Sequence, residues 1–143
     1  MASVFDAAKY ILHRMGRLST MKLQKLCYYA QAWSLVWDDE PLFDEDFRAW
    51  VNGPVCFELF AQTRGRFSIT EGDEPGDLNA LSDEQKDSID HVIDFYGGRD
   101  AQYLSELTHL EDPWILARNG LPMGAPCENV ISKESMAMYY SGL

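Results

Sequence analysis

The chain has 143 residues, 46% of them hydrophobic and 24% charged, which is the composition of an ordinary single globular domain. Its formal net charge of −11 argues against a general nucleic-acid-binding protein, because such binding needs Lys and Arg to neutralise phosphates. No apolar run approaches the roughly 20 residues that span a bilayer, and charged residues interrupt positions 1–20. We therefore expect a cytoplasmic protein with no signal peptide and no membrane partner.

The charge is unevenly distributed along the chain. Residues 1–37 contain five of the twelve basic residues and a single acidic one, whereas residues 38–143 contain seven basic and 22 acidic residues. This pattern predicts a basic corner on an acidic molecule, which suits an acidic protein partner better than nucleic acid. The five basic residues of the corner are Lys9, Arg14, Arg17, Lys22 and Lys25.

The first predicted helix runs from about Val4 to Met15, because apolar residues recur there along one helical face. Ser3 is a suitable N-cap, and Gly16 is the usual residue for a left-handed turn after a helix. Both ends of this helix are therefore marked in the sequence.

A second helix is expected from Ser19 or Thr20 to about Trp37. Its buried stripe is accompanied by further apolar and amphipathic residues, so the helix either lies centrally in a bundle or leaves aromatic residues exposed. The stripe consists of Leu23, Leu26, Cys27, Ala30, Trp33 and Trp37, and the residues beside it include Tyr28, Tyr29 and Gln31.

The middle of the chain predicts little regular structure. Residues 47–51 alternate as a short strand does, and Asn52-Gly53-Pro54 predicts a turn after them. Residues 64–81 are rich in Gly, Pro and acidic residues, which predicts a long, mobile surface loop. We expect one small two-stranded β element, in which residues 66–69 pair with residues 47–51.

Further helices follow from capping residues and apolar spacing. Together with the first two they predict a mainly α fold, a compact bundle of six or seven short helices that forms one domain over residues 1–143. The expected segments are Pro54 to about Thr63, Ser82 to Gly97, a helix after Asp100, a short helix at Asp112-Pro113, and Ser132 to about Ser141.

The sequence contains no pattern typical of a metal, cofactor or catalytic site. His13, His91 and His109 are far apart, and the three cysteines have neither zinc-binding nor disulfide-framework spacing. Glycine-rich phosphate loops and nucleophile-elbow motifs are absent. A pairing of Cys27 with His13 is formally allowed, but we expect no enzyme, no metal and no cofactor.

Three separated blocks nevertheless resemble the Panacea antitoxin domain, a family also called SocA-like or GepA-like after a proteolytic-adaptor antitoxin and a phage-associated element protein. With Ile131-Ser132 near the end, the similarity covers nearly the whole chain. The blocks are Met21–Trp33, then Phe47–Trp50 with Gly53-Pro54-Val55, then Leu104–His109 with Pro113-Trp114.

The resemblance implies the antitoxin of a type II toxin–antitoxin system, which neutralises a cognate protein toxin by binding it. The toxin is usually encoded by the adjacent gene, in bacteria or their phages. One family member delivers its toxin to a ClpXP-type bacterial protease, so a proteolytic adaptor is the alternative function. Candidate partner-binding residues are the positions of the second helix that lie off its buried stripe, namely Lys22, Lys25, Tyr28, Tyr29 and Gln31.

Two features depart from the family pattern. Asn52 stands where relatives often have a His before Gly-Pro, which favours a structural role for this turn. Many relatives also carry a helix-turn-helix segment for operator binding, and this chain shows none outside the domain. Transcriptional autoregulation is therefore not expected.

Overall fold

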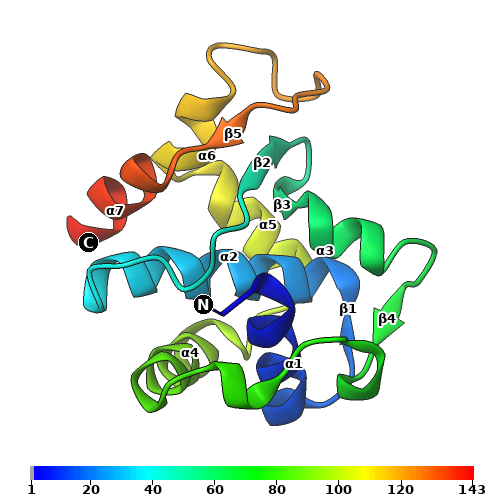
Figure 1. Cartoon of the computed structure of the whole chain (residues 1–143). Helices are drawn as coiled ribbons and strands as arrows, with labels where there is room; N and C mark the ends of the chain where they lie inside the picture. Colours follow the sequence, from blue (N-terminus) through cyan, green and yellow to red (C-terminus); the bar gives the residue numbers. More distant parts are fainter. Residues whose placement is uncertain (1) are drawn as a thin grey trace.

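The computed structural model describes residues 2–143 as seven α-helices and two short 3-10 helices with two small antiparallel sheets (Figure 1). The mainly α prediction is confirmed, although the β structure is more extensive than the single pair expected. The elements are α1 (Val4–Met15), β1 (Leu18–Ser19), α2 (Thr20–Trp37), β2 (Phe47–Trp50), β3 (Gly53–Cys56), α3 (Phe57–Gln62), β4 (Ser68–Ile69), η1 (Glu71–Asp73), η2 (Leu78–Ala80), α4 (Asp83–Tyr96), α5 (Ala101–His109), α6 (Asp112–Ala117), β5 (Val130–Ile131) and α7 (Lys133–Ser141).

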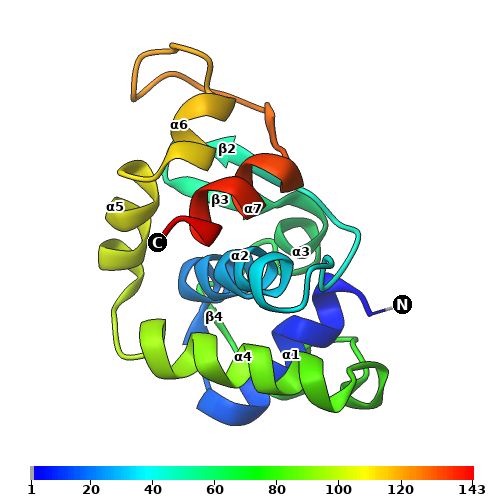
Figure 2. The same ribbon diagram turned by 90° about the vertical axis from the view of Figure 1, so that its left-hand side faces the viewer.

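Helix α2 forms the centre of the molecule and contacts α1, α4, α5 and α7. Figure 2 shows it nearly end-on, with α1 and α4 on one side and α7 and the three-stranded sheet on the other. Neighbours on every side explain why α2 is apolar around most of its circumference: the first of the two alternatives, a central helix, is the observed one. None of the helices between residues 2 and 143 is long and apolar enough to cross a membrane.

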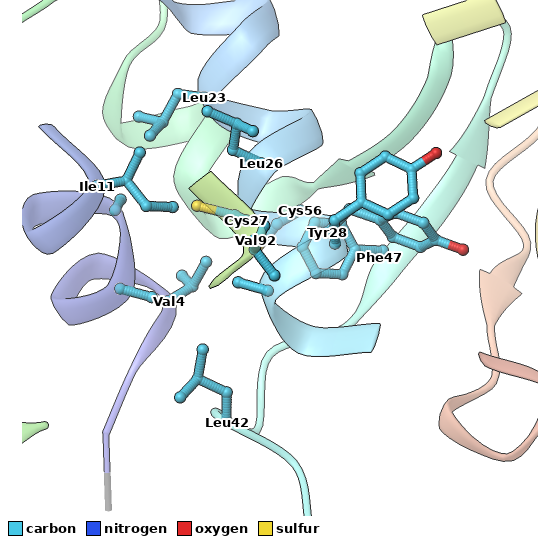
Figure 3. Close-up of a cluster of buried hydrophobic side chains, with 14 of the residues drawn as sticks. Val4, Ile11, Leu23, Leu26, Cys27, Tyr28, Leu42, Phe47, Cys56 and Val92 are labelled. Carbon is cyan, nitrogen blue, oxygen red and sulfur yellow. The ribbon is translucent and has the colours of Figure 1, made fainter. Parts of the chain in front are cut away.

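The core is continuous across α2. Figure 3 shows Val4 and Ile11 of α1 beside Leu23 and Leu26 of α2, with Val92 of α4 in the same cluster, and all five side chains are fully buried. Burying an aliphatic side chain of this size contributes about 2 kcal/mol, so this shared cluster is a main source of the fold's stability.

The predicted helix ends are confirmed where capping residues marked them. Ser3 and Asp6 form a reciprocal capping box at the start of α1, and Ser19 accepts a hydrogen bond from the backbone of Lys22 at the start of α2. Ser82 caps α4 in the same way. Such caps satisfy backbone N–H groups that have no partner inside the helix, and each contributes about 1 kcal/mol.

The predicted pairing of residues 47–51 with residues 66–69 is wrong. Strand β2 pairs with β3 through a tight turn, and its other edge pairs with β5, whereas β4 pairs with β1. The predicted helix start at Pro54 is also wrong, because Pro54 lies in β3 opposite Ala49. Strand β3 is at the edge of its sheet, where a proline without an N–H group is tolerated.

Residues 64–81 lie largely at the surface, as their composition predicts, but they contain β4, η1 and η2 and are attached to α1. The carbonyl of Phe5 lies so close to Gly76 that its oxygen would be 2.3 Å from an added Cβ atom. The Asp77 backbone N–H donates to Asp6 Oδ1 over 2.7 Å, and the Glu74 side chain is 3% exposed. Contacts with α1 therefore hold this segment in place, and no local sequence pattern predicts these contacts.

The basic corner is used inside the molecule. Its five residues contact acceptors from later parts of the chain, and these contacts attach the N-terminal quarter to the acidic remainder. Lys9 donates to the carbonyls of Glu71 and Glu74, Arg14 pairs with Asp90, Arg17 donates to Ser68, Lys22 to the carbonyl of Gly97 and Lys25 to the carbonyl of Pro54.

Glu74 makes the fold sensitive to pH. Both carboxyl oxygens are buried and lack a hydrogen-bond partner within residues 2–143, and burial raises the pKa of Glu74 from 4.5 to about 7. The folded state thus keeps a proton that the unfolded state releases, so stability falls as pH rises from about 4.5 to about 7. We predict that Glu74→Gln abolishes this loss, which is on the order of 2 kcal/mol in the wild type.

Urea denaturation at pH 5 and pH 7.5 measures the effect. The exposed residue Glu40 supplies a matched control, because Glu40→Gln removes one carboxyl without touching the core. Equal pH dependence in Glu74→Gln and wild type would contradict the assignment.

Candidate partner-binding site

The three family-like sequence blocks meet at the turn between β2 and β3, called here the Gly53 turn (residues 51–54). Lys25 Nζ, from α2, donates to the carbonyl of Pro54 over 3.1 Å. Ser105 Oγ, from α5, donates to the carbonyl of Asn52. Segments that are separated by up to about half of the chain are thus joined at one place.

Gly53 is required by this junction. Its φ of +111° is strained for any residue with a side chain, and an added Cβ would lie 2.8 Å from both Lys25 Cε and Thr108 Oγ1. The absence of a side chain lets α2 and α5 approach the turn from two directions.

Gln24 attaches α2 to the strand that follows the turn. Its Nε2 donates to the carbonyl of Cys56 over 3.1 Å, and its Oε1 accepts from the Cys56 N–H over 2.8 Å. The side-chain amide therefore pairs with the backbone of β3 as a neighbouring strand would, and it satisfies the free edge of the sheet.

Helix α6 supports the turn from the other side. Trp114 Nε1 donates to the carbonyl of Trp50 over 2.8 Å, and the buried Arg118 donates to the carbonyl of Ala49 over 2.8 Å. Arg118 also donates to the carbonyls of Pro122 and Ala125. A single guanidinium therefore joins the sheet to the connector between α6 and β5 (residues 118–129). This connector contains no regular structure of its own.

The titratable groups behind the turn are poorly solvated. Lys25 is 1% exposed, and burial lowers its pKa from 10.5 to about 7. Burial, together with the nearby charges of Lys25 and Arg118, lowers the pKa of His109, whose ring lies 4.2 Å from that of Trp114. His109 Nε2 is buried and has no hydrogen-bond partner within residues 2–143. Burial and the neighbouring charges therefore favour the neutral form of His109.

A pocket of about 470 Å³ opens beside the Gly53 turn, at the N-terminal end of α2. Its lining comes from α2, from the β2–β3 hairpin, from α3 with the residues after it, and from residues 126–128 before β5. The lining residues that carry the argument below are Lys25, Trp50, Phe60, Arg64, Arg66 and Glu128.

Four of the five predicted partner-binding residues are not at the surface. Lys25, Tyr28, Tyr29 and Gln31 are each at most 1% exposed, and only Lys22 is partly exposed. The expectation that these positions lie on an open face of the helix is wrong, because α2 has no open face.

The buried polar groups of α2 have partners of their own. Tyr29 and Tyr140 both donate hydrogen bonds to Glu111, over 2.7 and 2.8 Å, and burial raises the pKa of Glu111. Gln31 Oε1 accepts from the Leu42 N–H over 2.7 Å, which holds the segment after α2 against the helix. These residues stabilise the core and position its surroundings.

Exposed apolar side chains gather instead on the C-terminal half of the chain. Helices α4, α5, α6 and α7, with the residues that follow α5 and α7, contribute most of the strongly exposed apolar residues. Trp37, predicted as core, is also 48% exposed at the end of α2. The C-terminal apolar residues are Phe95, Leu110, Leu116, Met138 and Leu143, each at least 64% exposed.

The formally allowed Cys27–His13 pair does not exist. Cys27 is fully buried with its pKa raised by burial, whereas His13 lies at the surface against Glu71. In the described part of the chain, no three His, Cys, Asp or Glu side chains are placed to hold a metal ion.

Comparison with known proteins adds one finding. The sequence profile of a family described as "Antitoxin SocA-like, Panacea domain" matches residues 23–115, a range that runs from α2 into α6 and includes the whole Gly53 turn. No curated protein and no solved structure matched the chain.

We predict that Gly53→Ala destabilises the protein by about 2–3 kcal/mol, because the new Cβ adds a steric clash with Lys25 and Thr108 to the backbone strain. Gly65→Ala is the matched control: Gly65 also has a positive φ, of +84°, but no atom lies within 4 Å of the added Cβ. It should cost about 1 kcal/mol. Urea denaturation distinguishes the two, and equal losses would show that close approach at the turn is unimportant.

The lowered pKa of Lys25 predicts a second effect of pH on stability, in a different pH range from the effect of Glu74. Because its pKa is about 7 in the folded state and 10.5 ordinarily, the unfolded state binds more protons in between, and stability rises with pH from about 7 to about 10. The slope is at most about 1.4 kcal/mol per pH unit. Lys25→Met should lack this rise in denaturation experiments at pH 7 and 9.5. An identical rise in the variant would refute the role of Lys25.

Proposed function

Because this chain belongs to the SocA-like Panacea antitoxin family, we propose that it is the antitoxin of a type II toxin–antitoxin system. It neutralises a protein toxin by binding it directly in the cytoplasm, and the toxin is the product of the adjacent gene. The observation that carries this proposal is the family match over residues 23–115, about two thirds of the chain.

The arrangement of the matched blocks supports binding as the mode of action. The matched range ends in α6, and two residues within it, Lys25 and Trp114, support the Gly53 turn beside the pocket. Two of the three cysteines are poor nucleophiles, because burial raises the pKa of Cys27 strongly and that of Cys56 to about 12. A rigid scaffold with a preformed pocket is suited to holding a partner.

A proteolytic adaptor is the second candidate function, and one feature of the structure favours it. An adaptor must hold its client and a protease together, which requires two separate surfaces. The pocket lies at the N-terminal end of α2, and Trp37, which is 48% exposed, lies at the other end of the helix. A helix of 18 residues separates these ends by about 27 Å.

We predict that expression of the adjacent gene alone arrests growth, and that co-expression of this chain restores it, because the toxin is held in a complex. Growth curves measure the rescue, and co-purification measures the complex. A chain with Leu26→Asp, which places a charge in the core, is the unfolded control and should not rescue. An adjacent gene product that is harmless alone, or toxic despite this chain, would rule out the antitoxin.

The same strains separate the two candidate functions. Direct inhibition leaves the toxin present at an unchanged half-life beside the antitoxin. Delivery to a ClpXP-type protease shortens the toxin's half-life, and deletion of the protease restores both toxin level and growth arrest.

A further inference from the structure

The pocket beside the Gly53 turn has a charge opposite to that of the protein as a whole. Its lining includes three basic residues, Lys25, Arg64 and Arg66, and one acidic residue, Glu128, in a chain with a formal net charge of −11. A local excess of positive charge on an acidic molecule marks a place where an anionic group is preferred.

The acidic residue and one of the basic residues already have partners. Glu128 Oε1 accepts hydrogen bonds from Arg48 over 2.9 Å and from Trp50 Nε1 over 3.1 Å. Arg66 pairs with Asp73 at 3.0 Å. Neither Glu128 nor Arg66 therefore determines what the pocket accepts. The two lining residues that could bind an anion are Lys25 and Arg64.

These two cations are not neutralised by the protein itself. Within residues 2–143, no carboxylate lies within 4.0 Å of the charged nitrogens of Lys25 or Arg64. The Lys25 ammonium has three N–H groups but only one acceptor, the carbonyl of Pro54. The Arg64 guanidinium is exposed and lies over the ring of Phe60, 5.3 Å from its centroid.

Maintaining Lys25 in this place is costly. A buried ammonium with a single acceptor destabilises the fold, and Met or Leu would fill the same volume without that cost. An anion that reaches Lys25 offsets this cost. The position of Lys25 in the pocket lining therefore indicates a ligand.

The remaining walls are apolar and indicate what accompanies the anion. Trp50 and Phe60 pack edge to face, with ring centroids 5.0 Å apart, and Met21 and Val55 extend the apolar surface. A volume of about 470 Å³ exceeds what a single carboxylate needs and is in the range that encloses a large side chain with its neighbours. Nucleic acid is disfavoured, because its affinity depends on many phosphate contacts and the rest of the surface is acidic.

We propose that this pocket receives an acidic side chain of the toxin together with an adjacent apolar residue, with Arg64 as the outer contact and Lys25 as the inner one. This inference rests on the proposed function. The pocket accepts one acidic anchor of the toxin, and this contact sets the orientation of the complex.

The test uses the purified adjacent-gene product and isothermal titration calorimetry. Arg64→Gln should weaken binding by about 10-fold, and Lys25→Met by at least as much, because each removes one charge contact to a desolvated carboxylate. Arg99→Gln is the matched control: Arg99 is also exposed and also lies over an aromatic ring, that of Tyr103 at 4.8 Å, but it does not line the pocket. Its affinity should equal that of the wild type. Thermal unfolding confirms that all three variants are folded.

A double-mutant cycle then identifies the anchor. Each Asp and Glu of the toxin is changed to Asn or Gln, and one of these changes should weaken binding to the wild type but have little further effect on binding to Arg64→Gln. Wild-type affinity in both Arg64→Gln and Lys25→Met, or a scan with no such coupled residue, would overturn the inference and leave the antitoxin function standing. A wild-type protein that does not bind the toxin would overturn both.

Discussion

The hydrogen bond from Lys25 Nζ to the carbonyl of Pro54 is the contact around which the molecule is arranged. It joins the central helix to the β2–β3 hairpin, and it can form only because Gly53 leaves room for the lysine stem and for Thr108. Trp114 and Arg118 then hold the hairpin from α6 through the carbonyls of Trp50 and Ala49. These few contacts position the turn, the pocket beside it and the connector before β5.

Two buried titratable groups, Lys25 and Glu74, make the stability of the fold depend on pH in opposite directions. Lys25 and Glu74 both have a pKa of about 7 in the fold, and both are displaced there by burial. A raised acid loses stability as pH increases to about 7, and a lowered base gains stability above it, so their combined contribution is lowest near neutral pH. An anion at Lys25 would relieve one of these costs, which links occupation of the pocket to stability.

Short-range signals predicted much of the fold and little of the site. The ends of α1 and α2 follow from Ser3, Gly16 and Ser19, because a cap acts within one helical turn. The pairing of β4 with β1 was not predicted, because strands of two residues are too short to show an alternating pattern. The same limit applied to residues 64–81, where composition indicates a loop but Gly76 packs against the Phe5 carbonyl.

The sequence by itself determined the class of the molecule: its mainly helical structure, its acidic charge and, through three separated blocks, its family. Only the tertiary structure decided which contacts the polar residues of α2 make. Helical periodicity places Lys25 and Tyr29 off the apolar stripe, yet both are buried, because their partners Pro54 and Glu111 come from distant segments. The partner of a buried polar group is chosen by packing across the whole chain, and a local pattern cannot contain it.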